Sequence, residues 1–194
     1  MMRKMIFVLG MIALVSTSKV SGQERDFYNA PLFSVKTNAL YWLTTTPNMG
    51  LEVALGKKIT LDLSGTYNPW SFGDNKKIKH WLVQPEFRYW GGERFNGHFF
   101  GIHGLYGKFN AGGIKMLGLD KYRYEGSFHG GGISYGYQWI ISPQWNLEAG
   151  ISLGYAHLNY KRYGQSEGAA LLEKSSCNYW GPTQAGISII YFIR

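Results

Sequence analysis

Ser127 and His129 have the types and spacing best suited to nucleophilic chemistry. They are two residues apart, so on a β-strand both side chains would lie on one face. A serine beside a histidine base can attack an acyl group when an acid orients the histidine. Neither nearby acid suits that role, because Glu148 is expected on the opposite face of its strand and Glu125 lies only two residues from Ser127. Their odd numbers put Ser127 and His129 on the apolar face with Ile133 and Tyr135, and we expect them to be girdle or loop-end residues; a hydrolase is the alternative function.

A second group of ionisable residues occupies polar positions of segments that alternate between polar and apolar residues. It contains four acids, two bases and a histidine: Lys36, Glu52, Asp62, Glu86, Arg88, His103 and Glu148. Buried charges need ionic or hydrogen-bonding partners, so this set predicts a salt-bridged polar network inside a narrow barrel. A proton path, an ion path or a gated pore is the alternative, and the narrow interior of a small barrel disfavours it.

No residues are predicted to bind a metal or a cofactor, and none is predicted to be catalytic. The histidines and carboxylates do not form a set with metal-ligand spacing. Cys177 is the only cysteine, which excludes an internal disulfide.

The segment from Trp145 to His157 shows the clearest strand pattern. Strict alternation of apolar and polar or small residues predicts a β-strand whose two faces meet different environments. The apolar face carries Trp145, Leu147, Ala149, Ile151, Leu153 and Tyr155, and the other face carries Asn146, Glu148, Gly150, Ser152, Gly154 and Ala156.

The same alternation recurs in eight segments, which predicts an all-β fold: an eight-stranded antiparallel up-and-down transmembrane β-barrel. The first strand is expected over Phe33–Leu43 and the last over residues 186–193. Short turns are expected at 56–58, 91–96 and 142–144, and long loops at 68–79, 110–124 and 159–176. Pro85 lies within a strand and would remove a ladder donor, so we expect a β-bulge there; Pro182 raises the same question.

Two features favour a membrane barrel over a soluble one. The strand charges all fall on one face, as required where a lipid-facing charge costs about 2–4 kcal/mol at the bilayer midplane. The rest of that face is mostly Gly, Ser, Thr and Ala. The 26 glycines and the 16% aromatic content suit a crowded interior and interfacial aromatic belts.

The N-terminus has the composition of an export signal. A basic start at Arg3 and Lys4 precedes an apolar stretch that is too short to span a bilayer as a helix. We expect residues 1–22 to be a signal peptide and residues 23–194 to be the outer-membrane barrel domain. Removal of Arg3, Lys4 and Lys19 would lower the net charge from +8 to +5. The remaining basic residues are scattered, so nucleic acid is not expected as a partner.

Three runs carry a family resemblance: residues 36–42 (KTNALYW), 61–70 (LDLSGTYNPW) and 84–90 (QPEFRYW). They resemble a family of uncharacterised outer-membrane proteins of Gram-negative bacteria, filed as a domain of unknown function. The family's genes often lie beside genes for minor-type fimbriae. The C-terminal residues 189–194 are similar to the aromatic signal that barrel-assembly machinery recognises. The resemblance implies a barrel in the bacterial outer membrane and supplies no catalytic residues.

These observations lead to an expected function and its alternative. We expect a non-enzymatic outer-membrane barrel that is a structural or surface-interaction component, whose loops contact a fimbrial or other surface protein. Its expected partners are also outer-membrane lipid, lipopolysaccharide and, during insertion, the barrel-assembly machinery. The alternative is a lipid-modifying barrel hydrolase that uses Ser127 and His129.

Overall fold

The computed structural model describes residues 31–72, 76–114, 119–164 and 169–193. Nine strands and one short helix follow in the order β1 (Phe33–Asn38), α1 (Ala39–Leu43), β2 (Asn48–Ala54), β3 (Ile59–Asn68), β4 (Ser71–Phe72), β5 (Lys76–Trp90), β6 (Gly97–Ile114), β7 (Leu119–Ile140), β8 (Trp145–Gly164) and β9 (Leu171–Ile193). The expected signal peptide and the segments 73–75, 115–118 and 165–168 of the expected loops lie outside the described residues.

Eight of the strands close into a ring. Each pairs antiparallel with its neighbour in the chain, β3 pairs with β5, and β9 pairs with β1 to complete the circle. The two-residue β4 pairs only with β5 and is an appendage. The structure therefore confirms the eight-stranded antiparallel up-and-down barrel.

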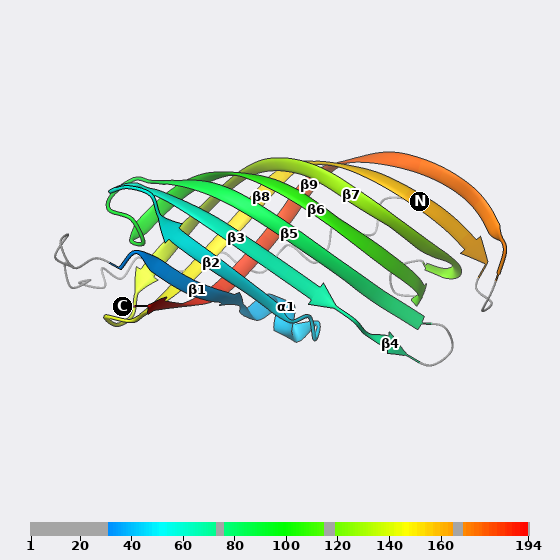
Figure 1. Ribbon diagram of the computed structural model, residues 1–194, viewed down its shortest axis with the longest axis horizontal. Coiled ribbons are helices and arrows are strands. Elements are labelled where there is room, and N and C mark those ends of the chain that lie inside the picture. The colour runs from blue at the N-terminus through cyan, green and yellow to red at the C-terminus, as the bar shows by residue number, and fades with distance from the viewer. Residues whose placement is uncertain (1–30, 73–75, 115–118, 165–168, 194) are drawn as a thin grey trace, which may run out of the picture.

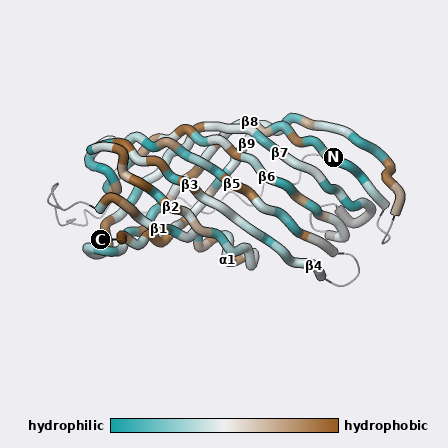
Figure 2. The backbone as a smooth tube through the Cα atoms, in the orientation of Figure 1, coloured by the Kyte–Doolittle hydropathy of each residue, from teal (hydrophilic) through white to brown (hydrophobic). Residues whose placement is uncertain are grey.

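Alternate side chains face the lumen and the outside, as the strand pattern predicted. On β8, Asn146, Glu148 and Ser152 are buried, whereas Trp145, Ile151 and Leu153 are exposed. Hydrophobic residues gather in the half of the barrel that holds the C-terminus (Figure 2). We call this half, with the turns at 55–58, 91–96 and 141–144, the lower half, and the opposite half the upper half.

The expected first strand is wrong in its second half. The chain turns into α1 after Asn38, whose side chain accepts a hydrogen bond from the Leu40 amide and caps the helix. The backbone N–H of Asn38 also donates a 2.6 Å hydrogen bond to the side-chain oxygen of Asn48 at the start of the next strand. β1 therefore ends and β2 begins near α1, while β5–β9 run much farther toward the upper end (Figure 1).

The expected long loops are also shorter than predicted, because strands occupy most of them. β6 continues to Ile114 and β7 begins at Leu119, and β8 continues to Gly164 before β9 begins at Leu171. Backbone ladder pairs extend through these segments, including Asn110 with Glu125 and Lys161 with Lys174. Polar composition led us to expect loops, but the extensions form a tall wall on one side of the barrel.

The two prolines behave differently. Pro85 pairs with Leu63 of β3, and the register between β5 and β6 is unchanged across it, so the expected bulge is wrong. The β5–β6 ladder lacks the pairs at residues 84 and 85. Gly104 lies opposite Pro85 and leaves room for the pyrrolidine ring. Beside Pro182 the register between β8 and β9 does shift, so a bulge occurs there.

Candidate functional site

The middle of the lumen is filled by a charged plug. Its members are Lys36, Glu52, Asp62, Glu86, Arg88 and Glu148, which come from β1, β2, β3, β5 and β8 and are all at most 6% exposed. Side chains from strands on opposite sides of the ring meet here because the polar faces of all these strands point inward. The sequence placed these residues on the inner face, but their partners depend on the ring closure.

Arg88 is the centre of the plug. Its guanidinium donates to Glu86 and Glu148, both at 2.8 Å, and to Glu52 at 3.2 Å. A second bond to Glu148 at 3.3 Å makes that pair bidentate, which is the strong geometry for arginine and carboxylate. The same guanidinium lies 4.3 Å above the centre of the Phe99 ring.

The carboxylates of the plug also have partners other than Arg88. Lys36 forms an ion pair with Asp62 and lies 3.7 Å from both Glu52 and Glu148. Thr60 donates to Glu52 at 2.5 Å, and Ser134 donates to Glu86 at 2.8 Å. Such pairing and hydrogen bonding is what buried charges require.

His103, the seventh residue of the predicted network, lies just above the plug. It is opposite Glu86 in the β5–β6 ladder, and its Nε2 is 3.0 Å from the hydroxyl of Thr183. Gln84 of β5 and Gln184 of β9 bridge the lumen at the same end of the plug through a 3.0 Å side-chain bond. The cavity among Glu86, Arg88 and Glu148 is only about 20 Å³, close to the space of one water.

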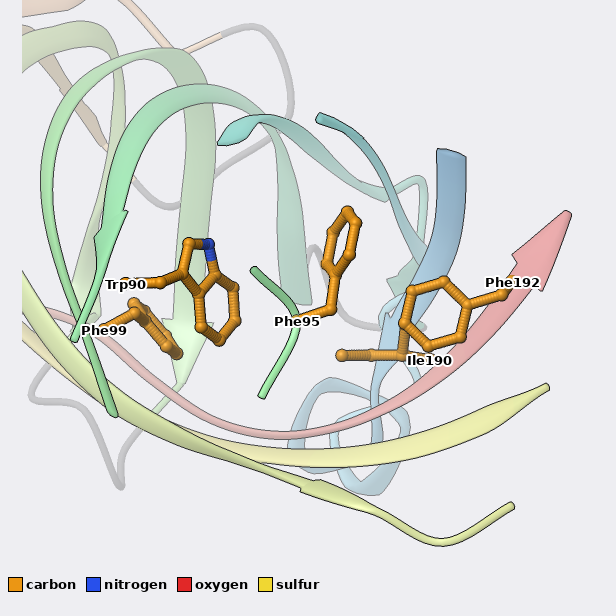
Figure 3. Packing of buried hydrophobic residues seen from close by; sticks show 5 residues of the cluster. All are labelled: Trp90, Phe95, Phe99, Ile190 and Phe192. Atoms are coloured by element: carbon orange, nitrogen blue, oxygen red, sulfur yellow. The ribbon is translucent and has the colours of Figure 1, made fainter. Parts of the chain in front are cut away.

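An aromatic cluster seals the lower end below the plug. Trp90, Phe95, Phe99, Ile190 and Phe192 are at most 2% exposed and pack together inside the ring (Figure 3). Trp90 and Phe99 have ring centres 5.1 Å apart, as do Phe95 and Phe192. Ile190 and Phe192 break the polar pattern of β9 in the sequence because their inward side chains complete this seal.

The turn at 91–96 is shaped to deliver one of these rings. Phe95 has a φ of 63°, which is unusual for a residue with a side chain. Its carbonyl accepts a 2.8 Å hydrogen bond from the Asn146 amide group of β8. This bond holds the turn inward, so that the Phe95 ring lies in the mouth of the barrel.

The upper half of the lumen is open. It forms a cavity of about 710 Å³ that we call the upper trough, enclosed by β3 and by β5–β9. One row of inward-facing residues, each paired with the next across neighbouring strands, marks its level: Asn68, His80, Phe109, Gly126, Tyr160 and Ser175. The lumen is thus open at the upper end and closed at the lower end.

The apolar face of the strands changes from the outside in the lower half to the inside in the upper half. On β8, Ile151 and Leu153 face outward in the lower half, whereas Leu158 and Tyr160 face inward in the upper half. On β6 and β7, Phe109 and Phe128 likewise face inward, with ring centres 6.2 Å apart. The outer face of this wall is polar and carries Lys108, Glu125, Asn159, Lys161 and Lys174.

The upper trough was not predicted from the sequence, although the chain contains a signal for it. The apolar positions of β8 are odd-numbered up to Tyr155 and even-numbered at Leu158 and Tyr160. The strand does not bulge against β7 there, so the change of phase means that the apolar face changes sides.

Ser127 and His129 lie on the outer face of β7 at the boundary between the two halves. His129 lies opposite His157 of β8, with ring centres 5.6 Å apart. Glu148 lies much lower on the same strand, buried in the plug. His157 in turn is 2.7 Å from the side-chain oxygen of Asn178. Glu125 is opposite Lys161 in the ladder, and among the described residues no carboxylate is hydrogen-bonded or ion-paired to His129.

Burial has one consequence for acid–base behaviour in the trough. It lowers the pKa of the His80 imidazole, and a backbone hydrogen bond at Ile78 opposes this effect only in part.

Within the part of the chain that the structure describes, no group of three or more His, Cys, Asp or Glu side chains is placed to hold a metal ion. No helix in the same part is both long and apolar enough to cross a membrane.

The geometry defines a class of protein: a closed eight-stranded up-and-down barrel with a charged plug, a sealed lower end and an open upper trough. The profile of the family described as "Protein of unknown function (DUF3575)" matches residues 7–193, and the chain belongs to that family. No curated protein matches the chain. No solved structure matches it either.

Proposed function

We propose that the protein spans the bacterial outer membrane as a β-barrel and serves there, without catalysis, as a structural or surface-interaction component. The observation that carries the proposal is the inside-out polarity of the lower half. Its outer face exposes apolar side chains such as Leu61, Phe87, Ile102, Ile133 and Leu153, whereas its interior holds the charged plug. That distribution suits an apolar solvent around the barrel.

The outer face also offers a site for acyl chains. An apolar groove of about 480 Å³ runs over β5–β8 between residues that include Tyr89, Phe100 and Ile151. Acyl chains of outer-membrane lipid or lipopolysaccharide would fill such a groove. Aromatic rings such as Trp145 and Tyr191, 4.9 Å apart near the lower end, suit a membrane–water boundary.

A surface-interaction role is supported by the part of the barrel above the apolar band. There the outer face is polar and the concave face is partly apolar, so the wall would stand in water with a binding face turned inward. The resemblance noted in the sequence, to a family encoded beside fimbrial genes, makes a fimbrial component one candidate partner.

Localisation is tested by fractionation and by matched variants. The protein should be recovered with outer membranes and should migrate differently on gels with and without heating. Ile133→Lys should lower the free energy of unfolding in vesicles by about 2–4 kcal/mol. Ser127→Lys, on the same strand and face in the polar region, should change it by less than about 1 kcal/mol. Recovery in the soluble periplasm, or equal effects of the two variants, would contradict the proposal.

The fimbrial link has its own test. Deletion of the gene should alter the number or length of fimbriae on the cell surface, and a plasmid copy should restore them. Unchanged fimbriation would remove fimbriae as the partner while leaving the membrane location standing.

A further inference from the structure

One edge of the upper wall has no neighbouring strand among the described residues. From Leu171 to Gln184, β9 pairs with β8 alone, and β1 joins its other side only from Ser188 onward. Between residues 171 and 180 every residue except Ser175 is exposed. This stretch extends far beyond α1 and β2 toward the upper end (Figure 1). The backbone N–H and C=O groups that point away from β8 are a template for another strand, except at Pro182, which has no N–H and whose carbonyl accepts a 3.0 Å hydrogen bond from the Tyr179 hydroxyl.

The face beside this edge is suited to bury apolar side chains. On the inner face, Leu158 and Tyr160 of β8 lie opposite Cys177 and Ser175 of β9, and Tyr160 and Ser175 line the upper trough. Because the two β9 side chains are small, the adjacent part of the trough is left open. An added strand would direct alternate side chains into this space.

The outer face beside the edge carries an unbalanced positive charge. Lys161 and Lys174 lie directly opposite each other in the β8–β9 ladder, and like charges in that position repel. Glu125 of β7 is opposite Lys161 on its far side. Lys174 has the free edge on its far side, where an acidic residue of an incoming strand would flank the lysine pair as Glu125 does on the side of β7.

We propose that the β9 edge from Leu171 to Gln184 is a strand-addition site for an extended segment of a partner protein. The segment has alternating apolar residues that enter the upper trough and an acidic residue beside Lys174. Main-chain hydrogen bonds supply affinity and the side-chain positions supply selectivity. The inference rests on the proposed surface-interaction function, because it gives that function a partner chemistry and a docking mode.

Two synthetic peptides of identical composition test the proposal on the full barrel in lipid nanodiscs. In one decapeptide Val and Leu alternate with Glu and Thr, and in the other the same residues are arranged in blocks. Cys177, the only cysteine, is exposed and lies on the edge, so it reports occupancy through its rate of maleimide labelling. The alternating peptide should slow labelling at least tenfold at saturation, and the block peptide should not.

Carbonyl-labelled peptide distinguishes strand addition from simple uptake of an apolar molecule. The ¹³C amide I band of the bound alternating peptide should shift to the β-sheet position. Protection of Cys177 without that shift would show that the trough holds apolar ligands in another form, and would overturn strand addition.

Neighbouring residues of β9 provide matched variants. Ser175→Lys places a charge in the trough and should weaken the alternating peptide about tenfold or more. Ser176→Lys changes the same edge on its outer face and should leave the affinity within about threefold. Lys174→Glu should weaken the acidic peptide and not a version in which Gln replaces Glu.

The remaining outcomes are decisive as well. Equal binding of both peptides, or no protection by either at millimolar concentration, contradicts the proposal. Disulfide-linked Cys177 dimers that block the peptide would assign the edge to a second copy of the chain instead. If the protein is a heat-modifiable barrel recovered with outer membranes but binds neither peptide, only this inference is overturned. If it is recovered from the soluble periplasm, the proposed function is overturned.

Discussion

Replacement of Arg88 by methionine should destabilise the barrel more than replacement of any exposed arginine. Arg88→Met keeps much of the side-chain volume and removes three hydrogen bonds of 2.8–3.2 Å to Glu86, Glu148 and Glu52. It leaves Lys36, which is close to Glu52, Asp62 and Glu148, as the one remaining cation of the plug. Breaking a buried pair by removing one partner costs about 3–5 kcal/mol, and this site has several such pairs, so we expect a loss at or above that range.

Urea unfolding of the barrel in lipid vesicles, followed by tryptophan fluorescence, measures this loss. Arg162→Met is the matched control, because the Arg162–Glu173 pair at 2.9 Å is 35% and 45% exposed and such pairs contribute about 1 kcal/mol or less. Adding Glu148→Gln to Arg88→Met should recover part of the stability, since one uncompensated charge is removed. A loss below about 1 kcal/mol for Arg88→Met, equal to that of the control, would refute the plug as a source of stability.

Three further predictions concern packing, the seal and pH. Gly130→Ala should lower the free energy of unfolding by about 1–3 kcal/mol, because the added methyl group would collide with the β8 backbone at Tyr155. Gly65→Ala is the control and should be tolerated, because the nearest atom to its added methyl group is 3.8 Å away. Unfolding curves of the two variants measure the difference. Trp90→Ala should cost about 3–5 kcal/mol in the same assay, and an unchanged midpoint would contradict the seal. The pKa of His80, measured by NMR, should lie below 6.5. The contribution of His80 to the free energy of unfolding is therefore fully present above pH 6.5 and is lost as the pH falls through the folded pKa, because the folded state disfavours the protonated imidazole. His80→Asn should abolish this pH dependence.

Alternation in the sequence was enough to predict the strand count and the inward face of each central strand. It placed Glu148 and Arg88 inside because a strand has only two faces and one of them was uniformly apolar. Their pairing could not be predicted, since it depends on which strands lie across the lumen after the ring closes. The parity of Ser127 was also correct, and the structure shows that it faces outward in a polar region.

The sequence misled us where composition and pattern disagreed. The segments 110–124 and 159–176 are polar enough to resemble loops, but their Tyr124 and Tyr160 pack 5.7 Å apart on the inner face of a continuing sheet. Solvent on the outer face permits polar residues there, so polarity no longer indicates the end of a strand. Pro85 needed no bulge because the β5–β6 ladder skips its position, opposite a glycine, without a change of register.

The central claim, that the lower half faces lipid and the upper wall faces water, is tested most directly along the outer face of β8. Single spin labels at residues 147, 149, 151, 153, 155, 159 and 161, in a Cys177→Ser background, are compared for collision with oxygen, which concentrates in lipid, and with a water-soluble nickel chelate. We expect preferential oxygen collision from Leu147 to Tyr155 and preferential chelate collision at Asn159 and Lys161. Chelate access at all of these positions would contradict it.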